Sequence, residues 1–149
     1  MHWLSRYVGI PFGSGSGQLT CWGLVRRVYA EQLSVVLPDH AEVSDRYVTA
    51  MARLRRNGAT PEEVRAARSA VAEEMERGHT SENWVESQQP ECFDVVLMTN
   101  IHSGRVGHVG VYVGGGRLLH TEAQTGSCIV PTNHISVSGR ITGFRRYNK

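Results

Sequence analysis

The chain has 149 residues, of which 40% are hydrophobic and 20% are charged, a composition typical of one globular domain and not of a disordered chain. Its 14 acidic and 16 basic residues give a formal net charge of +2, which is too small to indicate binding to nucleic acid. The three cysteines (Cys21, Cys92 and Cys128) are widely spaced and form no Cys-x-x-Cys pair, which excludes a disulfide framework and disfavours tetrahedral zinc.

Two helices joined by a glycine-rich loop are predicted at the N-terminal end. Residues 1–8 have apolar side chains at helical spacing, and a loop of alternating glycine and serine follows at 13–17. Helical spacing resumes over residues 19–33. Thr20 suits the N-cap of this helix, so Cys21 is predicted to lie in its first turn.

A helical hairpin is predicted within residues 40–88. Its first helix covers residues 44–56 and its second covers 60–77. The second helix has a strong start, because Thr60 can act as N-cap with proline at the next position and glutamate at the third. We expect one domain over residues 1–149, with this hairpin as an insertion.

After residue 90 the pattern changes to short β runs separated by turns rich in glycine, asparagine and serine. Helices followed by an antiparallel sheet make an α+β fold. The predicted strands are Asp94–Met98, Val106–Val113, Arg117–Glu122, Ser127–Val130 and Ile141–Arg146.

Cys21 is the best candidate for a nucleophile. The first turn of a helix offers unpaired N–H groups and the positive end of the helix dipole, which favour a thiolate and can hold an oxyanion. A buried, unreactive cysteine is the alternative, and position alone does not decide between the two.

Two histidines are predicted to meet on a β-hairpin. If the loop is the three glycines 114–116, Val113 faces Arg117, and His120 lies opposite Gly110. His108 is then a diagonal neighbour of His120 on the same face, about 7–8 Å away between backbones. This arrangement suits His108 as base for Cys21 and His120 as its orienting partner. Two polar residues on a half-exposed sheet face are the alternative.

Other residues rank lower as functional candidates. Trp3, Trp22 and Trp84 suit either a cleft or the core, Asp94 suits a turn, and Cys92 and Cys128 suit small buried positions. His102, His108 and His120 form a weak candidate metal set, because no His-Glu-x-x-His motif or nearby acidic ligand accompanies them. The glycine loop lacks a following Gly-Lys-Ser/Thr and is therefore not expected to bind phosphate.

Several of these segments together resemble the NlpC/P60 cysteine peptidases. They are Thr20-Cys21-Trp22-Gly23-Leu24-Val25, Pro90 with Asp94-Val95-Val96, His108-Val109-Gly110-Val111-Tyr112-Val113-Gly114, and Leu119-His120. The cysteine precedes the histidines, as in the unpermuted members. The run from Cys21 to Tyr29, Leu37-Pro38 and the closing Ile141-Thr142-Gly143-Phe144-Arg145-Arg146 look most like a phage tail-associated branch.

The resemblance implies a papain-like core with the nucleophile helix packed on an antiparallel sheet, and hydrolysis of peptide bonds in bacterial peptidoglycan. The family's cysteine, first histidine and third polar residue correspond to Cys21, His108 and His120. It also implies oxyanion or substrate contacts from Cys21, Phe12 and Trp22, and no metal or organic cofactor. The sequence departs from the family pattern in having Thr20 where aspartate is usual, Phe12 where tyrosine is usual, and a stretched turn over residues 90–94.

The expected partners are peptidoglycan stem peptides and, through the helical insertion, phage tail-tip proteins; nucleic acid and membrane are not expected. Residues 1–30 show no secretory signal, and no apolar run approaches the roughly 20 residues that span a bilayer. We therefore expect synthesis in a host cytoplasm and action from a phage tail on the periplasm or cell wall. A structural tail protein without catalysis, and an acyltransferase using the same three residues, are the alternatives.

Overall fold

The structure is a computed structural model, and it describes residues 3–38, 53, 58, 60–66, 69, 83–99 and 106–148. Its described helical segments and strands, in chain order, are η1 (Trp3–Tyr7), α1 (Cys21–Val28), η2 (Tyr29–Leu33), β1 (Trp84–Ser87), β2 (Val95–Thr99), β3 (Val106–Tyr112), β4 (Arg117–Glu122), β5 (Gly126–Pro131) and β6 (Ile141–Tyr147). Within the described residues, no helix has the length and apolar character needed to cross a membrane.

The six strands form one antiparallel sheet in the order β1-β6-β2-β3-β4-β5. All five predicted strands are present, with ends shifted by a residue or two. Helical segments followed by an antiparallel sheet agree with the predicted α+β class, while papain-like details and the inserted hairpin stay predictions. The sequence reasoning missed β1, which is four residues long and pairs only with β6 among the described strands.

The predicted nucleophile helix begins where the sequence indicates. Thr20 is the N-cap, and its Oγ1 accepts a hydrogen bond from the Gly23 amide at 3.0 Å. The prediction of one α-helix through residue 33 is wrong, because the last turn, η2, is a π-helix. Ser34 ends it in the left-handed conformation, with φ of 55°.

The inserted hairpin lies mostly outside the described residues. Apart from Arg53, the helix predicted over residues 44–56 is not described, nor is most of the one over 60–77. The start of the second helix is confirmed: residues 61–66 are helical, and Thr60 Oγ1 accepts a hydrogen bond from the Glu63 amide at 3.1 Å.

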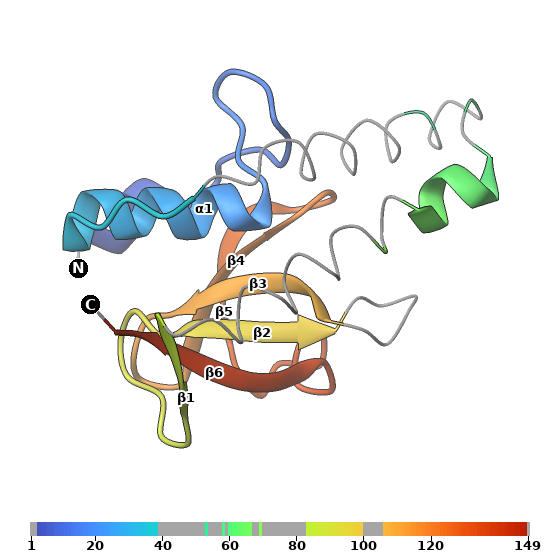
Figure 1. The fold of residues 1–149 in the computed structure, drawn as a ribbon. Coiled ribbons are helices and arrows are strands. Elements are labelled where there is room, and N and C mark those ends of the chain that lie inside the picture. The colour runs from blue at the N-terminus through green and yellow to red at the C-terminus, as the bar shows by residue number, and fades with distance from the viewer. Residues whose placement is uncertain are drawn as a thin grey trace.

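Both faces of the central sheet are apolar. Successive residues of β2 alternate between two clusters, with Val95 and Leu97 facing α1, and Val96 and Met98 on the opposite side with Val137. The segment between β5 and β6, which contains Val137, therefore covers the face that α1 leaves open. Figure 1 shows α1 lying over the sheet. Strands β3 and β4 lie together near the end of β3 and separate toward its start, and α1 packs against both strands.

Candidate active site

Cys21 is the first residue of α1, so its backbone N–H has no hydrogen-bond acceptor within the helix. The side chain is half-buried, and the desolvation of the thiol raises its pKa. The backbone amides of Val109, Trp22 and Cys21 itself face the sulfur and lower its pKa, which offsets part of this effect. Desolvation therefore outweighs these amides in setting the direction of the pKa shift.

The predicted hairpin register is confirmed. Val111 pairs with Leu119 and Tyr112 with Leu118, so the loop is the three glycines 114–116. Val109 and Val111 face the α1 side of the sheet. Because side chains alternate along a strand, His108 projects from the opposite face of β3.

The two imidazoles are in direct contact. Nε2 of His108 lies 2.9 Å from Nδ1 of His120, within hydrogen-bond distance. The ring centroids are 5.2 Å apart at an interplanar angle of 77°. Both residues are buried, with exposed fractions of 8% for His108 and 2% for His120. Burial lowers the pKa of both rings, and the nearby Arg140 guanidinium lowers it further.

Two observations connect Cys21 with this histidine pair. The Val109 amide that faces the sulfur belongs to the residue directly after His108. The Glu122 carboxylate raises the thiol pKa through its charge, and its Oε1 lies 3.9 Å from Nε2 of His108. The Cys21 thiol therefore lies beside the strand backbone that carries His108 and within reach of the Glu122 charge.

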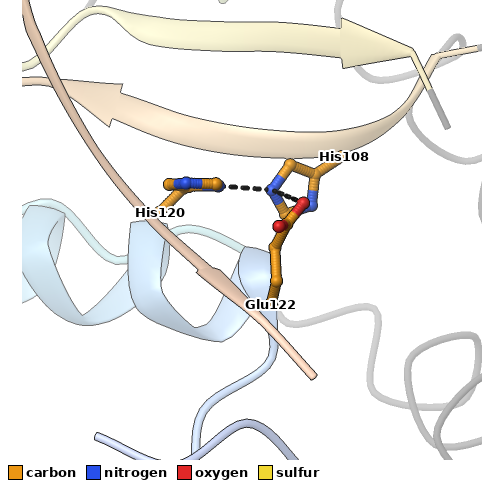
Figure 2. Close-up of side chains that lie close together, drawn as sticks. All are labelled: His108, His120 and Glu122. Carbon is orange, nitrogen blue, oxygen red and sulfur yellow. Dashed lines mark hydrogen bonds and ion pairs between the residues drawn. The ribbon is translucent and has the colours of Figure 1, made fainter. Parts of the chain in front are cut away.

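Sequence reasoning missed Glu122, which lies beside the histidine pair (Figure 2). The sequence nevertheless indicates Glu122. In the register that sets His120 opposite Gly110, continuing the pairing by two residues sets Glu122 opposite His108. Arg140, which was also missed, donates a hydrogen bond to Glu122 Oε1 at 2.8 Å. No periodic pattern marks Arg140, which lies in the segment before β6.

His108, His120 and Glu122 also have the donor types that zinc accepts, with one ligand atom from each lying within 4.8 Å of the others. The prediction that no acidic ligand lies near these histidines is therefore wrong, because Glu122 lies beside them. However, Nε2 of His108 and Nδ1 of His120 are engaged with each other, and Arg140 donates a hydrogen bond to Glu122. A metal ion bound through these atoms would displace both interactions and would lie beside a guanidinium.

The remaining candidate residues lie in different surroundings. Trp22 is half-buried and donates from Nε1 to the Pro38 carbonyl at 2.7 Å. Phe12 is also half-buried and forms a bridge with Leu19, which closes the glycine loop. Trp3 and Trp84 pack among other aromatic rings at the core. His102 lies outside the described residues.

Two of the three cysteines are not buried as predicted. Cys92 is exposed and Cys128 is half-buried; the Cys92 prediction is wrong because this residue lies in the turn before β2 and not in a strand. The turn role predicted for Asp94 is confirmed, since its carboxylate accepts a hydrogen bond from the Glu91 amide at 2.9 Å.

Comparisons with known proteins point to one family. The sequence profile of the NlpC/P60 family matches residues 9–146. Among solved structures, an NlpC/P60 family protein from Bacillus cereus ATCC 10987 aligns with a TM-score of 0.58 at 17% identity. A lipoprotein-like NLP/P60 family protein from Staphylococcus aureus subsp. aureus Mu50 aligns with a TM-score of 0.56 at 17% sequence identity. The NlpC/p60 domain of the peptidoglycan hydrolase SagA aligns with a TM-score of 0.50 at 14% sequence identity.

The chain corresponds to one part of the first two of these proteins. Each alignment covers 97% of this chain but 38% of the other chain. The SagA alignment covers 95% of this chain and 89% of that domain. A search of curated proteins gave no match.

Proposed function

The chain belongs to the NlpC/P60 family, and on that premise we propose that it is a cysteine endopeptidase that hydrolyses peptide bonds of bacterial peptidoglycan. The observation that carries this proposal is the buried 2.9 Å contact between His108 and His120, next to the amide that faces the Cys21 thiol. The fold similarity to a domain of the peptidoglycan hydrolase SagA supports this substrate class.

In the proposed mechanism His108 is the base. Its Nε2 is engaged with His120, so Nδ1 is the nitrogen left to take the thiol proton. The neutral ring then carries its proton on Nε2 and donates it to Nδ1 of His120, which fixes the tautomer of both rings. The lowered pKa of His108 and the raised pKa of Cys21 keep both groups neutral at rest. The proton therefore moves as the sulfur attacks.

The reaction is an acyl transfer in two stages. The Cys21 sulfur attacks a peptide carbonyl while His108 takes the thiol proton, and the backbone N–H of Cys21 binds the developing oxyanion. The tetrahedral intermediate breaks its C–N bond, and His108 returns the proton to the leaving amine. Water, deprotonated by His108, then attacks the thioester and releases a carboxylic acid and the thiol. Following the sequence resemblance, we also assign Phe12 and Trp22 to substrate binding.

Digestion of purified peptidoglycan, with mass spectrometry of the fragments, tests the proposal. The wild-type protein should release fragments that each carry a new amine or carboxyl terminus within the stem peptide. Cys21→Ala and His108→Ala should abolish this release, and His120→Ala should slow it, with all three variants folded by circular dichroism. Intact peptidoglycan after incubation with folded wild-type protein would refute the peptidase and favour a structural role.

For its biological setting, we infer from the sequence resemblance that the protein belongs to a phage tail and reaches the periplasm or cell wall with it. The insertion at residues 40–88 would then bind a tail-tip protein. Deleting residues 44–80 should abolish co-purification with phage tails while peptidoglycan cleavage is retained. Tail binding that survives this deletion would remove the role assigned to the insertion.

A further inference from the structure

A half-buried ion pair lies next to the histidines and has no part in the mechanism above. Arg140 donates from Nη1 to Glu122 Oε1 at 2.8 Å, and the two side chains are 15% and 30% exposed. Arg140 also donates from Nε to the Thr99 carbonyl at 3.1 Å and from Nη1 to the Ser136 carbonyl at 3.3 Å. The guanidinium is therefore fixed at several points, and it fixes the carboxylate in turn.

The carboxylate oxygen held by Arg140 is also the one that faces the proposed base. Glu122 Oε1 lies 3.9 Å from His108 Nε2, the nitrogen that contacts His120 (Figure 2). Glu122 follows His120 by two residues on β4, so both side chains project from the same face of the strand. One negative and one positive charge thus adjoin the pair of rings.

We propose that Glu122 and Arg140 are positioning residues for the histidine pair: Glu122 supplies the negative charge that faces the imidazolium formed during the reaction, and Arg140 fixes this carboxylate and offsets part of its charge. The proposal rests on the proposed function, because it assigns these residues to the same proton transfer. Neither residue needs to touch the substrate.

The opposing signs of the two charges explain why both are needed. Glu122 alone would favour a protonated ring at rest, which could not act as a base. Arg140 alone would oppose the imidazolium when it forms. Together they leave the resting rings neutral and still present an anion to the charged intermediate. Accordingly, the Glu122 charge raises the pKa of His120, and the Arg140 charge lowers the pKa of both rings.

Other titratable groups lie near this part of the structure. Among the described residues, Cys128 on β5 pairs with His120, His134 lies in the segment that contains Arg140, and the Glu122 charge acts on Cys21. His134 lowers the pKa of His120 through its charge. These groups remain unchanged in the variants below, so differences between the variants isolate the Glu122–Arg140 pair.

The experiment compares Glu122→Gln, Arg140→Gln and the double variant by NMR titration of the histidine ring protons. One ligand atom of His120 and one of Glu122 lie within 4.8 Å of each other, and an opposite charge at such a distance shifts a pKa by about 1 unit or more. Glu122→Gln, which keeps an acceptor for Arg140, should lower the pKa of His120 by about 1 unit. Arg140→Gln should raise the histidine pKa values, and the double variant should return them close to wild type.

A matched control is Glu91→Gln, which makes the same chemical change at an exposed partner of Arg146. It should leave the histidine titrations unchanged. If Arg140→Gln does not fold, Glu122→Gln still decides the question by itself. Histidine pKa values that stay at their wild-type positions in folded Glu122→Gln would overturn the proposal and leave only a structural ion pair.

Kinetics then separate this proposal from the proposed function. With a soluble stem peptide, Glu122→Gln should lower kcat with little change in KM and should move the histidine-dependent limb of the pH profile to lower pH. A wild-type kcat and pH profile in this variant would refute the positioning role and leave the peptidase assignment intact. An inactive wild-type protein would refute the peptidase assignment, and the NMR titration would still report whether the ion pair controls the rings.

Discussion

Gly110 on β3 lies directly against His120 on β4: a Cβ atom at position 110 would be 3.0 Å from the Cβ of His120. The same atom would be 2.6 Å from Leu118 Cδ1 and 2.7 Å from the carbonyl oxygen of Leu119. The Leu119 oxygen is backbone and cannot rotate away. The missing side chain of Gly110 is therefore part of what sets the position of His120 relative to His108.

Gly110→Ala should consequently impair both stability and activity. Overpacking of this kind costs about 1–3 kcal/mol in the free energy of unfolding. Displacement of His120 should also slow peptidoglycan cleavage beyond what the loss of folded protein explains. Denaturant unfolding and fragment release measure the two effects. Gly139→Ala is the control, since a Cβ atom there meets nothing within 4 Å; equal behaviour of the two variants would contradict the prediction.

The contact between Gly110 and His120 was predictable because it depends on local rules. A three-glycine loop and strict alternation set the register of β3 and β4, and a threonine before the helix set the position of Cys21. The features that were missed depend on distant parts of the chain. β1 exists because β6 offers an edge, and the Glu122 carboxylate is held by Arg140 from a segment without periodicity.

The burial of β2 on both faces shows the same limit in a different way. Such burial is unusual for an antiparallel sheet whose described helices pack on one side. Its explanation is Val137, which belongs to the segment between β5 and β6 and covers the second face. The same segment contains Arg140, so one stretch of chain both covers the second face of the sheet and places a positive charge beside Glu122. Sequence periodicity contains no information about this coverage.

Replacement of the Thr20 cap should destabilise the start of α1. Thr20→Ala removes the acceptor for the Gly23 amide and should lower the free energy of unfolding by about 1 kcal/mol. Thr20→Asp keeps an acceptor and adds a favourable charge at the helix start, so it should retain stability close to wild type. Chemical denaturation of the three proteins measures this. Equal stability of the alanine and aspartate variants would show that the cap contributes little.

Protonation of the buried histidines should make stability depend on pH. The folded pKa of His108 lies below its ordinary value of 6.5, so the unfolded chain binds protons more readily than the folded one. The free energy of unfolding should therefore be highest above pH 6.5 and should fall as the pH decreases below it. Each such histidine contributes at most about 1.4 kcal/mol per pH unit.

His108→Asn should remove the part of this slope that belongs to His108. Unfolding is measured in urea at a series of pH values, with Val36→Ala as a control at an exposed apolar position. The control should reproduce the wild-type slope below pH 6.5, and His108→Asn should flatten it. A wild-type slope in His108→Asn would mean that the ring is charged or solvated in the folded protein.

The thiol of Cys21 should react slowly with alkylating reagents near neutral pH. Burial raises its pKa above the ordinary value of 9.0, so little thiolate is present in the resting protein. Cys92 is exposed and serves as an internal reference, although partial burial also raises its pKa. Iodoacetamide labelling followed by peptide mapping should show Cys92 modified first. The rate at Cys21 should keep rising as the pH increases beyond 9.0. Rapid labelling of Cys21 that is already complete below pH 7 would instead indicate a resting thiolate–imidazolium pair, and the proton would then have moved before the substrate binds.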